Sequence, residues 1–273
     1  ALLDAKRALI VGVANKKSLA WGIARALHAH GAKLAFMCLE SNVRRVRKLA
    51  RELDTRTIIA CDVRSDEEIA LGFEQVKYAF GARLDILVHS IAFADFSDLE
   101  GEFIRTSRSG WHLALEISAY SLVALARHAR PLMSAGGGGS IMTMTFEGGR
   151  KVVPGYNIMG VAKAALDMTV RYLAYDLGPE HIRVNAISPG PIPTISSVMV
   201  DDLKNALQMF EERAPLLRNV TADDVAGTAI YLASDLSRSI TGSIIKVDAG
   251  MNIMAAPTAV HPVLKAKRKS TRV

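Results

Sequence analysis

The segment that decides the fold is Ala8-Leu9-Ile10-Val11-Gly12-Val13-Ala14-Asn15-Lys16-Lys17-Ser18-Leu19-Ala20-Trp21-Gly22. An apolar run of strand length reaches a tight turn at Gly12, and a helical pattern follows from Ser18. We expect Gly12 to permit a close backbone approach, Ser18 to cap the helix, and Gly22 to let the helix pack closely on the sheet. Free amides and the helix dipole at such a helix start favour a pyrophosphate, and we expect Ala14 to lie beside it. The segment is not Gly-x-Gly-x-x-Gly, so an ordinary strand–turn–helix joint explains it equally well.

The same alternation of short apolar runs and amphipathic stretches continues along the chain. The runs that we interpret as buried parallel strands are Ala8–Val13, Leu34–Cys38, Thr57–Ala60, Ile86–His89, Ser140–Thr145, Val184–Ile187 and Ile244–Val247. Helical patterns lie near residues 18–30, 43–53, 66–80, 107–130, 154–177 and 222–234. The repeated order predicts an α/β fold: a single Rossmann-type, doubly wound parallel sheet of about seven strands with helices on both faces. Ligands of such sheets bind at the carboxyl ends of the strands.

Length and composition agree with one globular domain at residues 1–256. Half of the 273 residues are hydrophobic and 22% are charged, which excludes a disordered chain. Five of the seven net positive charges fall in residues 257–273, which we expect to form a basic, flexible tail. No apolar run approaches the roughly 20 residues that cross a bilayer, and no secretory signal opens the chain. The only cysteines are Cys38 and Cys61, so we expect no disulfide scaffold, no metal site and a cytoplasmic location.

Charged residues follow the predicted second and third strands. Glu40 stands where dinucleotide sites often carry an acid that holds the adenosine ribose, which favours NADH. Arg44, Arg45 and Arg47 lie just beyond and could serve the 2′-phosphate of NADPH, so both cofactors stay open; a solvated helix start explains all four residues as well. After the third strand, we expect Asp62 to meet the adenine, with Val63 packed beside it.

The strongest chemical feature is Tyr156-Asn157-Ile158-Met159-Gly160-Val161-Ala162-Lys163. Residues seven apart share one helix face and lie about 10.5 Å apart along its axis. A nearby ammonium favours the anion of a tyrosine and strengthens it as a hydrogen-bond donor to an oxyanion. In isolation, a core tyrosine beside a surface lysine is the commoner explanation of such a pair.

The surrounding motifs resemble the short-chain dehydrogenase/reductase superfamily and, more narrowly, its enoyl-[acyl-carrier-protein] reductases. The resemblance covers about residues 2–254. It rests on Gly12-x5-Ser18-x3-Gly22, Cys61-Asp62-Val63, His89-Ser90-Ile91-Ala92-Phe93-Ala94, Pro154–Lys163, Arg183–Ser188, Gly190-Pro191-Ile192 and Val247-Asp248-Ala249-Gly250. Ordinary members of the superfamily place the lysine four positions after the tyrosine, where this chain has Gly160. The spacing found here is typical of the enoyl reductases.

The resemblance implies a role for each matching position. It implies catalytic roles for Tyr156 as donor to the enolate oxygen, for Lys163 on the nicotinamide ribose, and for Phe146 as a packing residue. Cofactor contacts would come from Gly12, Ala14, Ser18, Leu19, Leu39, Glu40, Asp62, Val63, Ser90, Ile91, Ala92, Lys163, Ile192 and Thr194. The acyl substrate would meet Ala94, Met159, Met199 and Phe210. The implied reaction is reduction of a trans-2-enoyl thioester by NADH, with NADPH possible.

Two positions depart from the family pattern. Many bacterial members have a second tyrosine where this chain has Phe146, and a phenylalanine cannot donate a hydrogen bond. It could still pack against the nicotinamide or the acyl chain. Pro193 replaces a common arginine at the entry to residues 193–217, which we interpret as a substrate loop with Met199 and Phe210 facing the acyl chain. A helix packed on the core is the alternative for this segment.

The implied partners are an acyl carrier protein that bears the substrate and further copies of the chain in a homotetramer. Acyl carrier proteins are acidic, so the basic tail could attract them, could touch RNA, or could remain solvated. Two other functions stay open from the sequence. One is a carbonyl or alcohol dehydrogenase of the same superfamily. The other is a non-catalytic nucleotide- or RNA-binding protein, although the nearly neutral body argues against nucleic acid as a partner.

Overall fold

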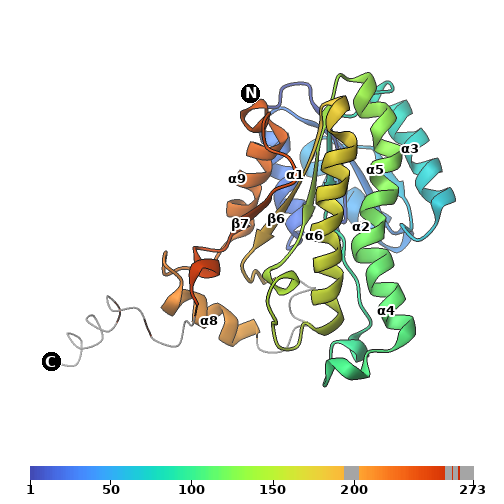
Figure 1. Cartoon of the computed structure of the whole chain (residues 1–273). Coiled ribbons are helices and arrows are strands. Elements are labelled where there is room, and N and C mark those ends of the chain that lie inside the picture. Colours follow the sequence, from blue (N-terminus) through green and yellow to red (C-terminus); the bar gives the residue numbers. More distant parts are fainter. Residues whose placement is uncertain (194–202, 256–259, 261–263, 265–273) are drawn as a thin grey trace.

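The computed structural model describes residues 1–193, 203–255, 260 and 264. Its strands form one parallel seven-stranded sheet in the order β3-β2-β1-β4-β5-β6-β7 (Figure 1). The strands are β1 Arg7–Val11, β2 Lys33–Cys38, β3 Ile58–Ala60, β4 Ile86–His89, β5 Gly139–Met144, β6 Ile182–Pro189 and β7 Ile244–Val247. The predicted Rossmann-type sheet is therefore confirmed.

Helices cover both faces of the sheet. One face carries α1 Leu19–Ala29, α2 Glu40–Ala50 and α9 Ala222–Ala233, and the other carries α3 Asp66–Phe80, α5 Ser121–Ala135 and α6 Asn157–Leu177 (Figure 1). Among the described residues, two further α-helices are α4 Arg108–Leu115 and α8 Leu203–Arg213. Short 3-10 turns lie at Arg51–Leu53, Phe96–Asp98, Phe103–Arg105, Glu147–Gly149, Gly178–Glu180, Asp235–Ser237 and Met251–Ile253.

The apolar strands form because successive side chains enter opposite cores. In β1, Ala8 and Ile10 belong to the core under α1, α2 and α9, whereas Leu9 and Val11 belong to the core under α3, α5 and α6. Each of these side chains is fully buried or nearly so. A strand that is buried on both faces must be apolar throughout, which is why the sequence pattern is continuous rather than alternating.

The helical pattern predicted at 107–130 is confirmed, since the chain is helical from Arg108 to Ala135, with a π-helical segment, Glu116–Tyr120, between α4 and α5. One expectation about a helix is wrong in detail. Gly22 does not serve packing of α1 on the sheet. A Cβ at Gly22 would lie 3.1 Å from the Cβ of Ala222, so this glycine lets α1 pack against α9.

Two broader expectations can be compared with the structure. Among the described residues, no helix is both long and apolar enough to cross a membrane. Cys38 and Cys61 are both free and buried. Burial raises the pKa of the Cys38 thiol to about 11, so this thiol stays protonated and unreactive at neutral pH.

Candidate dinucleotide and active site

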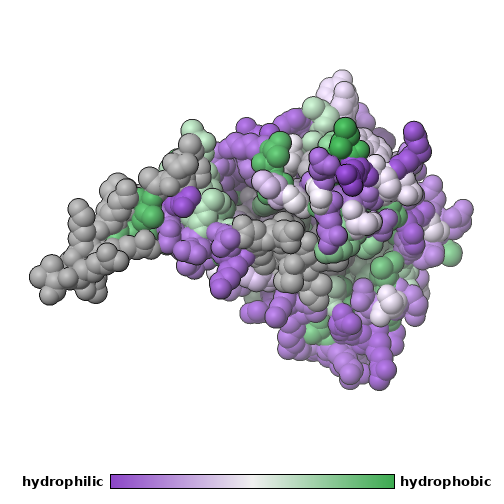
Figure 2. All heavy atoms as spheres, turned by 90° about the horizontal axis from the view of Figure 1, so that it is seen from below, coloured by the Kyte–Doolittle hydropathy of each residue, from purple (hydrophilic) through white to green (hydrophobic). Residues whose placement is uncertain are grey.

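The predicted site residues follow the carboxyl ends of six neighbouring strands. Because all seven strands are parallel, the segments after β1 to β6 meet at one edge, at the lower end of Figure 1. Figure 2 looks onto this edge and shows a mostly hydrophilic surface with scattered hydrophobic groups. The strand order reverses between β1 and β4, which is where ligands of doubly wound sheets bind. Thr194 and Met199 lie outside the described residues.

The turn after β1 touches the turn after β4. Gly12 has a φ of +106°, and a Cβ there would lie 2.1 Å from the carbonyl oxygen of Ser90, so only glycine fits. Ser18 occupies the N-cap position of α1, but its hydroxyl donates to the carbonyl of Asn15 at 2.6 Å and does not cap the helix. Ser18 is therefore the N-cap residue, as expected, but without a capping side-chain hydrogen bond. The first-turn amides, including that of Leu19, are left without a side-chain cap, and this arrangement suits a pyrophosphate.

The segment after β2 combines an exposed apolar side chain with charges of both signs. Leu39 is 48% exposed and precedes Glu40, which is also exposed. On α2, a guanidinium nitrogen of Arg45 lies 3.4 Å from the carbonyl oxygen of Ala14. A cleft of about 460 Å³ beside it is lined by Asn15, Lys16, Lys17, Arg45 and Leu49. Of the three arginines, Arg45 is thus the one that the fold brings to the loop after β1.

The segments after β3 and β4 are held by local polar contacts. Hydrogen bonds from Arg64 lower the pKa of Asp62, which stays charged and partly exposed next to Val63. After β4, the Ser118 hydroxyl accepts from the amide of Phe93 at 3.0 Å and lies 3.2 Å from its carbonyl oxygen. Ser118 belongs to the π-helical segment, which therefore supports the chain that carries Ser90, Ile91, Ala92 and Ala94.

A small apolar cluster lies beside the tyrosine. Ala94 and Met159 are both buried in it, and Tyr156 packs against its edge. The Met159 sulfur lies 3.8 Å from the Ser118 hydroxyl. The structure therefore brings together two of the four predicted substrate residues. Phe210 lies on α8, buried against Gly190 after β6, and Ile192 in the same segment is buried too.

Tyr156 stands at the start of α6 and contacts Phe146. The two rings meet edge to face, with centroids 5.0 Å apart and an interplanar angle of 65°. Burial, with a further contribution from the Asp167 carboxylate, raises the pKa of Tyr156 above its ordinary value. We expected the lysine to favour the tyrosine anion, and this is wrong: burial governs the pKa of Tyr156, so the phenol keeps its proton.

Lys163 is buried two turns further along α6. Its side chain is 5% exposed, and Nζ donates to the carbonyl of Met144, at the end of β5, at 2.8 Å. Burial lowers the pKa of Lys163 to about 8, while Asp167 acts in the opposite direction. The amine therefore remains largely protonated at neutral pH, and one of its three hydrogens is already used.

Sequence reasoning missed the role of His89 at the end of β4. The ring is fully buried and its two nitrogens lie 2.7 Å from the Thr143 hydroxyl and 2.8 Å from the Ser121 hydroxyl. Burial, followed by the charge of Lys163, lowers the pKa of His89 to about 3. A neutral histidine thus ties β4, β5 and α5 together beneath the lysine. A histidine that closes an otherwise apolar strand was the available signal.

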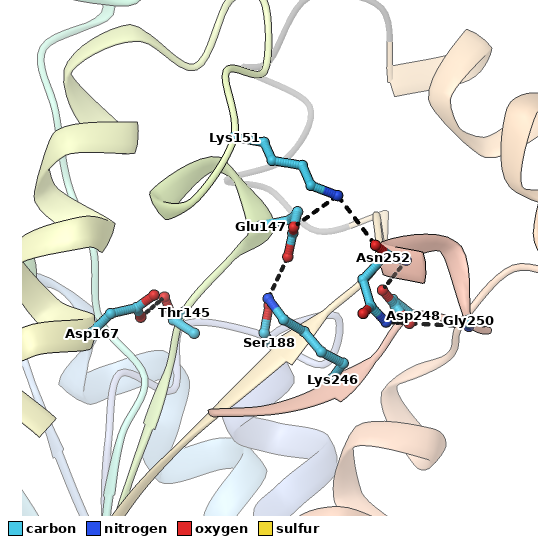
Figure 3. Close-up of polar contacts among 9 residues, drawn as sticks. All are labelled: Thr145, Glu147, Lys151, Asp167, Ser188, Lys246, Asp248, Gly250 and Asn252. Carbon is cyan, nitrogen blue, oxygen red and sulfur yellow. Dashed lines mark hydrogen bonds and ion pairs between the residues drawn. The ribbon is translucent and has the colours of Figure 1, made fainter. Parts of the chain in front are cut away.

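Sequence reasoning also missed a polar network across the ends of β5, β6 and β7 (Figure 3). Glu147 forms an ion pair with Lys246, whose Nζ lies 3.2 Å from the Ser188 hydroxyl. Lys151 lies 3.4 Å from Glu147 and donates to the carbonyl of Asn252 at 3.2 Å. Nearby, the buried Asp167 accepts a hydrogen bond of 2.5 Å from Thr145.

A doubly wound sheet with an uncapped helix start after β1 and a tyrosine–lysine pair at its carboxyl edge defines a nicotinamide-dependent short-chain dehydrogenase/reductase. A family model described as "Enoyl-(Acyl carrier protein) reductase" matches residues 12–252. The chain belongs to this enoyl-[acyl-carrier-protein] reductase family.

Individual relatives agree over nearly the whole chain. The enoyl-[acyl-carrier-protein] reductase [NADH] FabI of Bacillus cereus is 49% identical, over 93% of this chain and 99% of its own length. The Nostoc sp. protein of the same name is 47% identical, over 92% and 98%. Among solved structures, the B. cereus enzyme with NADP+ and an indole naphthyridinone has a TM-score of 0.90 at 49% identity, covering 93% of this chain and 99% of that one. The Anaplasma phagocytophilum enzyme with NAD has a TM-score of 0.90 at 44% identity, covering 94% and 98%.

Proposed function

We propose that this protein reduces the trans-2 double bond of enoyl-[acyl-carrier-protein] thioesters with NADH, as a step of fatty-acid elongation. The observation that carries the proposal is the pair of the partly buried Tyr156 and the buried Lys163 at the carboxyl edge of the sheet, in a chain of this family. The pair supplies one neutral hydrogen-bond donor and one cation at the place where a doubly wound sheet receives its ligands.

The chain offers a dinucleotide a contact surface along the whole edge. We propose that the first-turn amides of α1, with Ser18 and Leu19, hold the pyrophosphate beside Gly12 and Ala14. The adenosine would lie against Leu39, Glu40, Asp62, Val63, Ser90, Ile91 and Ala92, and the nicotinamide against Ile192 and Thr194. When bound, the cofactor supplies the hydride that the reaction needs.

Tyr156 acts as the donor to the thioester oxygen. Its raised pKa keeps the phenol protonated, so it can hydrogen-bond an oxygen on which negative charge grows. Phe146 cannot donate, but its edge-to-face contact restricts the tyrosine ring. Such a donor stabilises the transition state more than the ground state, and removing one typically costs about 10²–10³ in rate.

Lys163 orients the cofactor. One of its hydrogens is bound by the Met144 carbonyl, and the other two are available to the hydroxyls of the nicotinamide ribose. Holding the ring in one orientation converts binding energy into reactive geometry. Because the pKa of Lys163 is about 8, this contact is charge-assisted at neutral pH.

The acyl chain would lie on apolar side chains at the same edge. Ala94 and Met159 share the cluster next to Tyr156. We propose that residues 193–217 include the substrate loop; of its two predicted substrate residues, Phe210 lies buried on α8 and Met199 lies outside the described residues. Each methylene buried there would contribute about 0.8 kcal/mol.

The natural substrate carrier would be an acyl carrier protein in the cytoplasm, with the basic residues 257–273 as an attractive surface for its acidic groups. We also propose that the protein is a homotetramer. An exposed stripe on α6 supports self-association: Met168, Tyr172 and Tyr175 are 47%, 68% and 83% exposed. Large apolar side chains at helical spacing on an outer face are typical of a surface that a second copy covers.

A substrate panel tests the proposal. We expect the protein to consume NADH with a crotonyl or longer enoyl thioester and not with simple ketones. Tyr156→Phe should lose about 10²–10³ in rate and keep its affinity for NADH, because the ring and its packing remain. Turnover of ketones without enoyl thioesters would instead establish a carbonyl reductase. Salt-sensitive RNA binding that depends on residues 257–273, with no reductase activity, would establish a nucleic-acid protein.

A further inference from the structure

A buried carboxylate lies one helical turn beyond the lysine and has no part in the function proposed above. Asp167 follows Lys163 by four positions on α6, so both side chains share one face of the helix. Both are 5% exposed. An acid at such a depth is unusual unless it is paired.

We propose that Asp167 is a positioning residue for the active site: its carboxylate is the counter-charge of the Lys163 ammonium, and through Thr145 it fixes the end of β5 on which that ammonium is bound. The proposal rests on the proposed role of Lys163 in holding the cofactor.

The geometry links two consecutive residues of the strand end to two residues of α6. The Met144 carbonyl accepts from Lys163 at 2.8 Å, and the Thr145 hydroxyl donates to Asp167 at 2.5 Å. The backbone amide of Thr145 also donates to the carbonyl of Ile187 in β6 at 2.9 Å. Phe146, which contacts Tyr156, is the next residue. The carboxylate therefore fixes the segment on which both members of the catalytic pair depend.

Asp167 is the negatively charged group that acts on the Lys163 ammonium. Burial alone would favour a neutral amine, and Asp167 is the group that raises the pKa of Lys163 against burial. His89 on β4 faces the lysine as a neutral ring, and the Tyr156 phenol is protonated. With a pKa of about 8, the amine is close to losing its proton at physiological pH, so the loss of one negative charge would change its state.

Asp167 and Lys163 act on each other. Burial raises the pKa of the Asp167 carboxyl group above its ordinary value, and the Thr145 hydrogen bond and then Lys246, Lys163 and Arg171 oppose that rise. Lys246 on β7 is itself paired with Glu147 (Figure 3). Lys163 and Asp167 thus each oppose the effect of burial on the other. The consequence for the cofactor is direct, since an ammonium has three hydrogens to donate and a neutral amine has two.

The test measures NADH affinity by fluorescence titration from neutral to alkaline pH. Wild type should bind well below about pH 8 and more weakly above it, as Lys163 loses its proton. Asp167→Asn should move this midpoint toward lower pH by about one unit or more. Asp167→Glu should restore the wild-type midpoint. The matched control is Asp176→Asn, which removes the same charge from an exposed position of the same helix and should leave the midpoint unchanged.

A uniform loss of affinity in Asp167→Asn, with the midpoint unmoved, would show a purely structural role and overturn the inference. If Asp167→Asn does not fold, Thr145→Val keeps the carboxylate and removes its hydrogen bond. Because the end of β5 is then no longer fixed, NADH binding at neutral pH should weaken; a neutral-pH affinity identical to that of wild type would also overturn the inference. A wild-type chain that binds no NADH at any pH overturns the proposed function and the inference together, whereas normal wild-type binding with an unmoved Asp167→Asn midpoint overturns the inference alone.

Discussion

The Gly148→Ala substitution should displace the catalytic tyrosine without touching its hydroxyl. Gly148 follows Phe146 by two residues, and a Cβ there would lie 2.5 Å from Cδ1 and 3.0 Å from Cε1 of the Tyr156 ring. The added Cβ would also lie 3.2 Å from Cδ1 of Phe146, so the Tyr156 ring has no room to move toward Phe146. Gly148 has no positive φ, which means that alanine fits the backbone and only the ring contact is strained.

The contact gives the expected size of the effect. Ordinary contacts begin near 3.4 Å, so the ring must move by about 1 Å, and a misplacement of that size costs about 10²-fold in rate. We therefore expect kcat for an enoyl thioester to fall about 10²-fold. The dissociation constant of NADH should stay close to that of wild type, because the Lys163 bond to Met144 is not touched. Overpacking should also lower the free energy of unfolding by about 1–3 kcal/mol.

Two controls make the outcome specific to the tyrosine. A Cβ at Gly227 in α9 meets nothing within 4 Å, so Gly227→Ala should leave kcat unchanged and raise stability by up to about 1 kcal/mol. In a Tyr156→Phe background, Gly148→Ala should cost little further rate, because the hydroxyl that it displaces is already gone. Wild-type kcat in Gly148→Ala, or a full additional loss in the double variant, would refute the assignment of the rate to the position of Tyr156.

Three further predictions follow from the described contacts. His89 has a pKa of about 3 in the folded chain against 6.5 when unfolded, so only the unfolded chain binds its proton between these values. The free energy of unfolding should therefore fall by up to about 1.4 kcal/mol per pH unit as the pH drops from 6.5 toward 3. In urea titrations, the free energy of unfolding of His89→Gln should depend less on pH than that of wild type. Equal pH dependence in the two proteins would contradict a neutral His89. Arg45→Ala should weaken NADPH about fivefold and leave NADH nearly unchanged in direct binding assays, and equal effects on both would remove Arg45 as a 2′-phosphate contact. Tyr172→Glu should lower the mass of the assembly measured by light scattering, whereas Tyr78→Glu, at an exposed aromatic residue of α3, should leave it unchanged. An unchanged mass in Tyr172→Glu would exclude the exposed stripe on α6 as the contact between copies.

The sheet could be predicted because its signals are local. Each strand is an apolar run bounded by turn residues, and parallel pairing places their ends together without further information. The motifs after β1, β4 and β5 therefore fell at one edge, as expected. The π-helical segment inside the predicted 107–130 helix could not be predicted from the sequence. Its Ser118 contacts Phe93, which lies 25 residues earlier in the chain.

The electrostatics of the site could not be predicted in the same way. The sequence shows a tyrosine near a lysine, but the pKa of Tyr156 is governed by burial, which only the packed structure supplies. Glu147 and Lys246 are 99 residues apart, and nothing in their separate surroundings indicates a pair. Asp167 is different, because its position four residues after Lys163 on a predicted helix is visible in the sequence and could have been used.

The contact between Gly12 and Ser90 has a thermodynamic consequence for cofactor capture. The loops that follow the paired strands β1 and β4 touch backbone to backbone at this point. The backbone of these two loops is thus already ordered once the chain has folded, and it does not have to become ordered when the dinucleotide binds. The loss of conformational entropy that opposes cofactor binding should therefore be small at these loops.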